Sequence, residues 1–146
     1  IQLAPMIEEI FTDLAPLVEK RGITLEADGD GVMTGSDALI YRLIFNLTEN
    51  AVKYNRPGGS VRVCVIQETE KLLIRVSDTG CGIPDEYQQS IFQPFFRVDR
   101  SRNREYGGAG LGLSLVWEIA DLHGGCVWVE ASSEKGSTIA VELPVQ

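Results

Sequence analysis

Apolar residues recur at helical spacing in the first part of the chain. Within residues 4–20 they fall every three or four positions, which predicts an amphipathic helix that Pro16 kinks or divides and that Gly22 ends. The apolar positions of this helix are Ile7, Ile10, Phe11, Leu14 and Val18. The following residues, 23–27, predict a short strand.

A second helix is expected in the next apolar-periodic segment. Either Ser36 or Asp37 can cap its amino terminus, and the pattern continues to about Lys53. The residues at 55–59 have the composition of a turn and end the helix.

The rest of the chain predicts two strand pairs, separated by a long glycine-bounded segment and a helix. The first pair is 61–68 with 71–78, and the second is 126–131 with 137–143. The helix is expected over about 111–123, where it would bury Leu111, Leu115, Ile119 and Leu122.

Helices interleaved with hairpins, without signs of repeated β-α-β crossovers, indicate an α/β (α+β) fold. We expect a two-layer sandwich in which a mixed, mostly antiparallel sheet carries helices on one face. The whole chain, 1–146, is interpreted as one domain whose first 20 residues are a linker and first helix. The segment 84–110 is longer than ordinary loops, and we expect it to be a mobile lid.

The apolar stripe of the second helix ends in polar side chains. Leu39 and Leu43 are followed on the same face by Asn46, Asn50 and Lys53. Because buried amides need hydrogen-bond partners, this end of the helix either faces a polar cavity or simply emerges into solvent.

A carboxylate ends the apolar face of the strand at 71–78. By the period of two, Asp78 shares its face with Leu72, Ile74 and Val76. Such a carboxylate is costly unless it accepts strong hydrogen bonds, either from backbone amides in the next turn or from the amino group of a ligand. The glycine-spaced turn at 79–84 brings backbone close to Asp78 and favours the ligand.

A second glycine-rich stretch, 107–112, leads directly into a predicted helix and so offers free N–H groups to phosphate. It is not a dinucleotide-binding turn, because Leu113 stands at the third glycine position, and it is not a P-loop. Four arginines precede it and indicate a nearby anion, an acidic partner or a solvated charge run. They are Arg97, Arg100, Arg102 and Arg104.

Composition limits the classes of ligand and the cellular compartment that we expect for this chain. The net charge of -8 argues against a nucleic-acid surface. Cys64, Cys81 and Cys126 form no C-x-x-C pair, so we expect reduced thiols in a cytoplasmic protein, without a metal or disulfide role. No signal peptide is visible and no apolar stretch approaches the roughly 20 residues of a membrane helix. We therefore expect no membrane contact in this fragment, although a larger parent could be anchored in a membrane.

Five short motifs, in this order and spacing, resemble the boxes of the histidine-kinase ATPase domain. That family belongs to the superfamily that includes DNA gyrase and certain chaperones. The matching segments are 46–54 (N box), 78–84 (G1), 91–97 (F), 108–113 (G2) and 135–138. The resemblance implies the catalytic domain of a sensor histidine kinase, with ATP and Mg²⁺ as its ligands.

The resemblance also implies residue roles. At the adenine end, Asp78 would accept the adenine amino group, with Gly82 and Thr138 shaping the pocket and Gly80 and Ile83 in the same nucleotide-binding set.

At the phosphate end, Asn50 would bind Mg²⁺ through its side-chain oxygen, and Asn46 would assist one turn earlier. Lys53 and Arg97 would contact phosphate, and Tyr54 would pack on the nucleotide. The backbone amides that would cover the phosphates belong to Gly108, Gly110, Leu111 and Gly112.

One position separates transfer from hydrolysis in this superfamily. Gyrase-like relatives carry a glutamate base where this chain has Asn46, and an amide cannot activate water. With Asn46, Lys53 and Arg97 as catalytic residues, the resemblance implies donation of the γ-phosphoryl group to a histidine. That histidine would lie on a separate dimerisation domain of the parent kinase, and a response regulator would act downstream.

The single histidine, His123, follows a helix in a position that relatives often fill with a structural histidine. We therefore expect it to be structural, and the isolated chain not to autophosphorylate. Two alternatives stay open. One is an anti-sigma-type serine kinase, although its relatives usually carry glutamate at the Asn46 position. The other is a nucleotide-sensing or partner-binding module without transfer activity, against which the intact Asn50, Lys53 and Asp78 argue.

Overall fold

The computed structural model of the chain describes residues 1–94 and 112–146. Three helices, two short 3-10 helices and five strands lie in these ranges. They are α1 (Leu3–Arg21), β1 (Thr24–Gly29), α2 (Asp37–Lys53), β2 (Ser60–Gln67), β3 (Lys71–Asp78), η1 (Asp85–Tyr87), η2 (Ser90–Phe92), α4 (Gly112–Leu122), β4 (Cys126–Ser133) and β5 (Gly136–Pro144). The predicted lid, 84–110, falls largely outside the described residues, and its described beginning contains η1 and η2.

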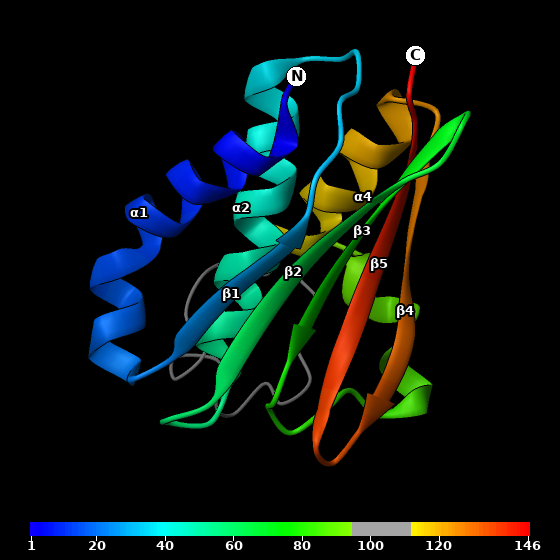
Figure 1. The fold of residues 1–146 in the computed structure, drawn as a ribbon. Helices are drawn as coiled ribbons and strands as arrows, with labels where there is room; N and C mark the ends of the chain where they lie inside the picture. Colours follow the sequence, from blue (N-terminus) through cyan, green and yellow to red (C-terminus); the bar gives the residue numbers. More distant parts are fainter. Residues whose placement is uncertain (95–111) are drawn as a thin grey trace.

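The five strands form one sheet in the order β1-β2-β3-β5-β4. β1 pairs with β2 in parallel, whereas the other three pairings are antiparallel. Figure 1 shows α1, α2 and α4 on one face of this sheet, with α1 against β1, α2 against the centre and α4 against β4 and β5. The predicted fold class is confirmed. The parallel pair β1–β2 is joined through α2, so the fold contains one crossover that the interpretation of interleaved hairpins did not include.

The expectation that Pro16 could divide the first helix is wrong, because α1 runs without a break through Pro16. The buried residues of α1 are Leu3, Ile7, Ile10 and Leu14, and partly buried Leu17 and Val18 continue the contact beyond the proline. Packing on both sides of Pro16 offsets the local cost of the missing N–H. Gly22 ends the helix in the left-handed conformation, at a φ of 66°.

Ser36, rather than Asp37, caps the amino terminus of α2. Its Oγ accepts the N–H of Leu39 at 3.3 Å, and Asp37 is the first helical residue. The cap satisfies one of the free N–H groups in the first turn of the helix.

The predicted buried face of α4 is wrong at two positions. Leu115 and Leu122 are 37% and 74% exposed. The helix instead buries Ser114, Val116, Ile119 and Ala120. Because α4 packs against both α2 and the sheet, small and β-branched residues allow close approach on that face. The Leu111 position lies outside the described residues.

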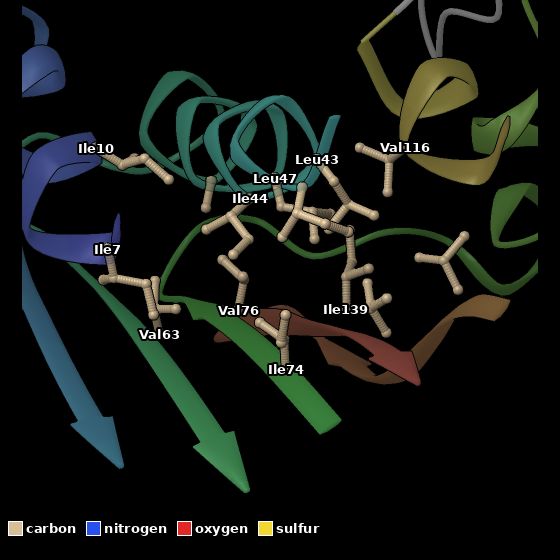
Figure 2. Packing of buried hydrophobic residues seen from close by; sticks show 14 of the residues in the cluster. Ile7, Ile10, Leu43, Ile44, Leu47, Val63, Ile74, Val76, Val116 and Ile139 are labelled. Carbon is tan, nitrogen blue, oxygen red and sulfur yellow. The ribbon is translucent and has the colours of Figure 1, made fainter. Parts of the chain in front are cut away.

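The core lies between the helices and the sheet. In Figure 2, Ile7 and Ile10 of α1 and Leu43, Ile44 and Leu47 of α2 point toward the sheet residues Val63, Ile74, Val76 and Ile139. Burial of each such side chain contributes on the order of 1.5–3 kcal/mol. Within the two described ranges, no helix is long and apolar enough to cross a membrane.

Candidate functional site

Asp78 lies at the end of β3, where the apolar face of the strand reaches the edge of the core. Its Oδ1 accepts the N–H of Gly80 at 2.9 Å and the N–H of Ser137 at 3.3 Å, and its Oδ2 accepts the Ser137 hydroxyl at 3.0 Å. Burial raises the pKa of Asp78 above its ordinary value, and these hydrogen bonds oppose the shift. Three donors fix the carboxylate and leave part of its acceptor capacity for a ligand.

The pairing of β3 with β5 decides which hydroxyl lies beside Asp78. Asp78 is directly opposite Ser137, whereas Thr138 is opposite Ser77. The Oγ1 of Thr138 lies 2.9 Å from the Oγ of Ser77, on the other face of the sheet. The structure therefore brings Ser137 to the carboxylate, whereas the hydroxyl of Thr138 pairs with Ser77. The part in shaping the pocket that the resemblance implied for Thr138 stays a prediction. Motif matching alone could not separate these neighbours, because their faces depend on the register.

The glycines after β3 allow the chain to pass close to other backbone. A Cβ on Gly80 would lie 2.5 Å from the carbonyl oxygen of Tyr54. Gly82 has a φ of 81°, and a Cβ there would lie 2.0 Å from the carbonyl oxygen of Ser133. The turn is thus wedged between the end of α2 and the β4–β5 hairpin.

The same turn is held by a residue that sequence reasoning missed, Ser132 of β4. Its Oγ accepts the N–H of Ile83 at 2.6 Å and donates to the carbonyl of Ile83 at 3.1 Å. Ile83, a predicted nucleotide-binding residue, therefore has its backbone fixed at both polar groups. No local pattern in 126–133 identifies this serine, because its partner lies about 50 residues earlier.

Asn55 joins the end of α2 to the end of β3. Its side chain is buried, with 5% of the residue exposed. The Nδ2 donates to the Ser60 carbonyl at 2.8 Å, and the Oδ1 accepts from the Arg56 N–H at 2.8 Å and from the Thr79 hydroxyl at 2.9 Å. Sequence reasoning took 55–59 only as a turn. This amide fixes Thr79, the residue that follows Asp78.

The polar stripe of α2 reaches the same end of the molecule. Asn46 is buried, and its Nδ2 donates to the carbonyl of Gly112 at 3.3 Å, which ties α2 to the start of α4. Asn50 is half-buried one turn later. Lys53 lies 3.6 Å from Glu49 in an ion pair whose two side chains are about one-third exposed, and Tyr54 is 38% exposed. Leu39, the expected start of the stripe, is itself 36% exposed.

Several predicted site residues fall outside the described part of the chain. They are Arg97, Gly108, Gly110 and Leu111. Gly112, at the start of α4, is described. The roles implied for these residues stay predictions.

The donor set near α2 determines how a metal could be held. In the described ranges, no group of three or more His, Cys, Asp or Glu residues is arranged to hold a metal ion. Mg²⁺ is commonly held by one or two protein oxygens, with substrate phosphates and water completing the octahedron. The half-buried amide of Asn50 fits such a sparse site, in which ATP supplies most of the ligands.

His123 connects the end of α4 to the cap of α2. Its Nε2 accepts the N–H of Ser36 at 3.2 Å, and its Nδ1 lies 2.9 Å from the carbonyl oxygen of Ile119. A carbonyl can only accept and a backbone N–H can only donate, so the hydrogen is on Nδ1. These contacts support the structural role expected for this histidine.

Comparison with known proteins gives the same assignment over most of the chain. The sequence profile of the histidine kinase-, DNA gyrase B- and HSP90-like ATPases matches residues 35–146. The sensor histidine kinase RppB of Synechocystis is 34% identical over 146 residues, covering 98% of this chain and 32% of RppB. The sensor histidine kinase WalK of Bacillus subtilis is 41% identical over 141 residues, covering 95% of this chain and 22% of WalK.

Solved structures agree with the sequence comparison. The catalytic domain of the histidine kinase ThkA superposes with a TM-score of 0.84 at 26% identity, covering 99% of this chain and 97% of that domain. ThkA has also been solved in complex with the response regulator protein TrrA.

The sheet, the helical layer and the polar end formed by α2, β3 and β5 define an ATP-binding domain of the sensor-kinase class. The chain belongs to the histidine kinase-, DNA gyrase B- and HSP90-like ATPase family. The resemblance inferred from the five motifs is thereby confirmed. The chain spans about a third or less of the length of these two curated relatives.

Proposed function

We propose that this chain is the catalytic domain of a sensor histidine kinase, which binds Mg²⁺ and ATP and donates the γ-phosphoryl group to a histidine on a separate dimerisation domain. One observation carries the proposal. A half-buried carboxylate with a raised pKa lies at the same end of the fold as the buried and half-buried amides of α2. The family and the named relatives support ATP as the nucleotide and a sensor kinase as the parent.

At the adenine end, the carboxylate of Asp78 accepts a hydrogen bond from the amino group of adenine. Gly80 and Ser137 hold its two oxygens in place before the ligand arrives, which lowers the ordering cost of binding. Gly82 and Ile83, whose backbone Ser132 fixes, form the adjacent wall of the pocket. We assign to Ser137 the place that the resemblance implied for Thr138.

At the phosphate end, Asn50 provides the oxygen for Mg²⁺, and Asn46 holds the start of α4 in place through Gly112. Lys53 leaves Glu49 and contacts phosphate instead. This exchange costs little, because an ion pair at the protein surface contributes little stability in water. Tyr54 packs on the nucleotide. The phosphate-contacting roles implied by the motifs are kept for Arg97, Gly108, Gly110, Leu111 and Gly112.

The chemistry is a transfer rather than a hydrolysis. An imidazole nitrogen of the acceptor histidine forms a bond to the γ-phosphorus while the bond to the β–γ bridging oxygen breaks, so that ADP leaves. Mg²⁺, when bound, neutralises charge on the phosphates. The amide of Asn46 cannot accept a proton from water, so the chain's own residues position the nucleotide and do not activate a water molecule.

The binding site is tested by isothermal titration calorimetry with Mg·ATP. Asp78→Asn and Asn50→Ala should each weaken binding by about tenfold or more, since a hydrogen bond to a charged group is worth about 1.5–3 kcal/mol. Asp121→Asn removes one exposed carboxylate at the other end of α4 and serves as the matched control. Unchanged affinity in both site variants would refute the assignment.

The acceptor domain and a response regulator follow from the same proposal as partners. The complex of ThkA with TrrA is a precedent for the second. The named relatives are sensor histidine kinases, so neither the serine-kinase alternative nor a module without transfer activity is favoured.

We place the domain, as a single unit, in the cytoplasm, where a membrane-anchored parent would expose it to ATP.

A further inference from the structure

A groove lies beside β4, and none of the candidate nucleotide-binding residues that the structure describes lines it. Its volume is about 580 Å³. η1 and η2 form one wall, Trp117 of α4 forms the end, and β4 forms the other wall through Val127, Trp128 and Val129. Figure 1 shows α4, the light green segment of the short helices and β4 together at this side of the sheet.

The wall formed by β4 belongs to the outermost strand of the described sheet. Successive strand residues point to opposite faces, so Val127 and Val129 lie on one face and Trp128 on the other. A groove that touches all three therefore reaches the main chain of β4 as well as its side chains. Among the described strands β4 has one neighbour, β5. Main-chain groups of such an edge are a template for another extended segment.

The register of β4 limits where a segment can pair. The strand is regular against β5 from Cys126 to Val129, and its register shifts between Val129 and Ala131. A bulge of this kind interrupts strand addition. The regular part spans about 13 Å at about 3.3 Å per residue, which suits a short peptide better than a long intermolecular sheet.

The side chains around the groove define the chemistry of the occupant. Trp117 is 48% exposed and Trp128 36% exposed, so both offer apolar surface. Asp85 and Glu86 are exposed on the opposite wall, and no Lys or Arg is among the lining residues that the structure describes. The groove therefore offers Trp128 on one face of the sheet, and Trp117 with two carboxylates on the other.

We propose that this groove binds an extended peptide segment whose basic and apolar side chains alternate, and which adds as a strand along β4. The apolar side chains pack on Trp128, on the face of the sheet away from the helices. The basic side chains point to the helical face, where Asp85 and Glu86 lie with Trp117. The partner is thus a basic, strand-forming segment of a protein.

The two tryptophans of the chain both line the groove, so intrinsic fluorescence reports on its occupancy directly. The probe is an acetylated and amidated octapeptide of alternating lysine and valine, titrated at low salt. We expect a saturable change in tryptophan emission that weakens as salt is added. The same response should persist in Asp78→Asn, so that failure of the ATP site and failure of the groove are distinguishable.

Charge and main-chain pairing are tested separately. The double variant Asp85→Asn/Glu86→Gln should weaken peptide binding about three- to tenfold. Glu8→Gln/Glu9→Gln removes two adjacent exposed carboxylates from α1 and should leave binding nearly unchanged. Two further peptides carry N-methyl groups on alternate amide nitrogens, one at the odd positions and the other at the even positions. Only one of these sets of N–H groups faces β4, so the peptide methylated on that set should lose binding.

Three outcomes would overturn the proposal. They are no saturable response to the peptide, equal weakening by the two charge variants, or equal binding of the parent and both N-methylated peptides. Sedimentation equilibrium adds a fourth, because a dimer that the peptide does not dissociate would make a second copy of this chain the occupant of the edge.

Discussion

Replacing Asn55 by alanine tests whether the buried amide holds the two halves of the site together. The change removes hydrogen bonds to the Ser60 carbonyl, the Arg56 N–H and the Thr79 hydroxyl. At a net value of about 1 kcal/mol each, the three bonds predict a loss of about 3 kcal/mol in the free energy of unfolding. The unpaired groups that remain are partly buried, so the loss should not be much smaller.

Urea unfolding measures this loss, and a double-mutant cycle isolates one bond. Thr79→Val keeps the volume of the side chain but removes its hydroxyl. The double variant Asn55→Ala/Thr79→Val should therefore be less destabilised than the sum of the two single variants, by about 1 kcal/mol. Gln2→Ala, at an exposed amide, should cost less than about 0.5 kcal/mol.

The same variant should also weaken ATP binding, because Thr79 follows Asp78 and its anchor is lost. Calorimetry at a urea concentration well below the transition separates this effect from unfolding. A loss below about 1 kcal/mol for Asn55→Ala, or strictly additive single effects in the cycle, would show that the amide is not a joint between α2 and β3.

Two further predictions concern ionisation and the single histidine. Because burial raises the pKa of Asp78, the folded state holds this proton more tightly than the unfolded state, so its ionisation costs stability as pH rises above about 4. Asp78→Asn can keep the same hydrogen-bond partners, so at neutral pH it should be at least as stable as the parent. In urea titrations the difference in the free energy of unfolding should vanish below about pH 4. A variant less stable than the parent at neutral pH would contradict this. His123→Ala should lower the free energy of unfolding by about 1–2 kcal/mol through loss of its bonds to Ser36 and Ile119. In the unsubstituted chain, labelled ATP should leave no acid-labile phosphate on His123, and label at that residue would refute its structural role.

Much of the fold could be predicted from local patterns. The period of two placed Leu72, Ile74, Val76 and Asp78 on one face of β3, and the structure buries the three apolar residues there. The helical period placed the buried face of α1 correctly at Ile7, Ile10 and Leu14. These features depend on neighbours only a few residues apart, so the sequence contains enough information to predict them.

The face of α4 could not be predicted in this way. Ile119 belongs both to the stripe with Leu115 and Leu122 and to the stripe with Val116 and Ala120. Leucine content favoured the first stripe, whereas packing against α2 and β4 buried the second. The choice between two apolar faces depends on the shape of the neighbours, which a single-helix pattern does not contain.

The order and spacing of the motifs determined, from the sequence alone, that this chain is an ATPase domain of the histidine-kinase type, and Asn46 in place of glutamate indicated transfer. Only the tertiary structure decided which residues support the site. Ser137 rather than Thr138 meets Asp78 because of the β3–β5 register, and Asn55 meets Thr79 because the chain returns to the end of α2. Both contacts join residues 24 or more positions apart. Local sequence cannot determine such pairings, because register and chain return are properties of the assembled sheet.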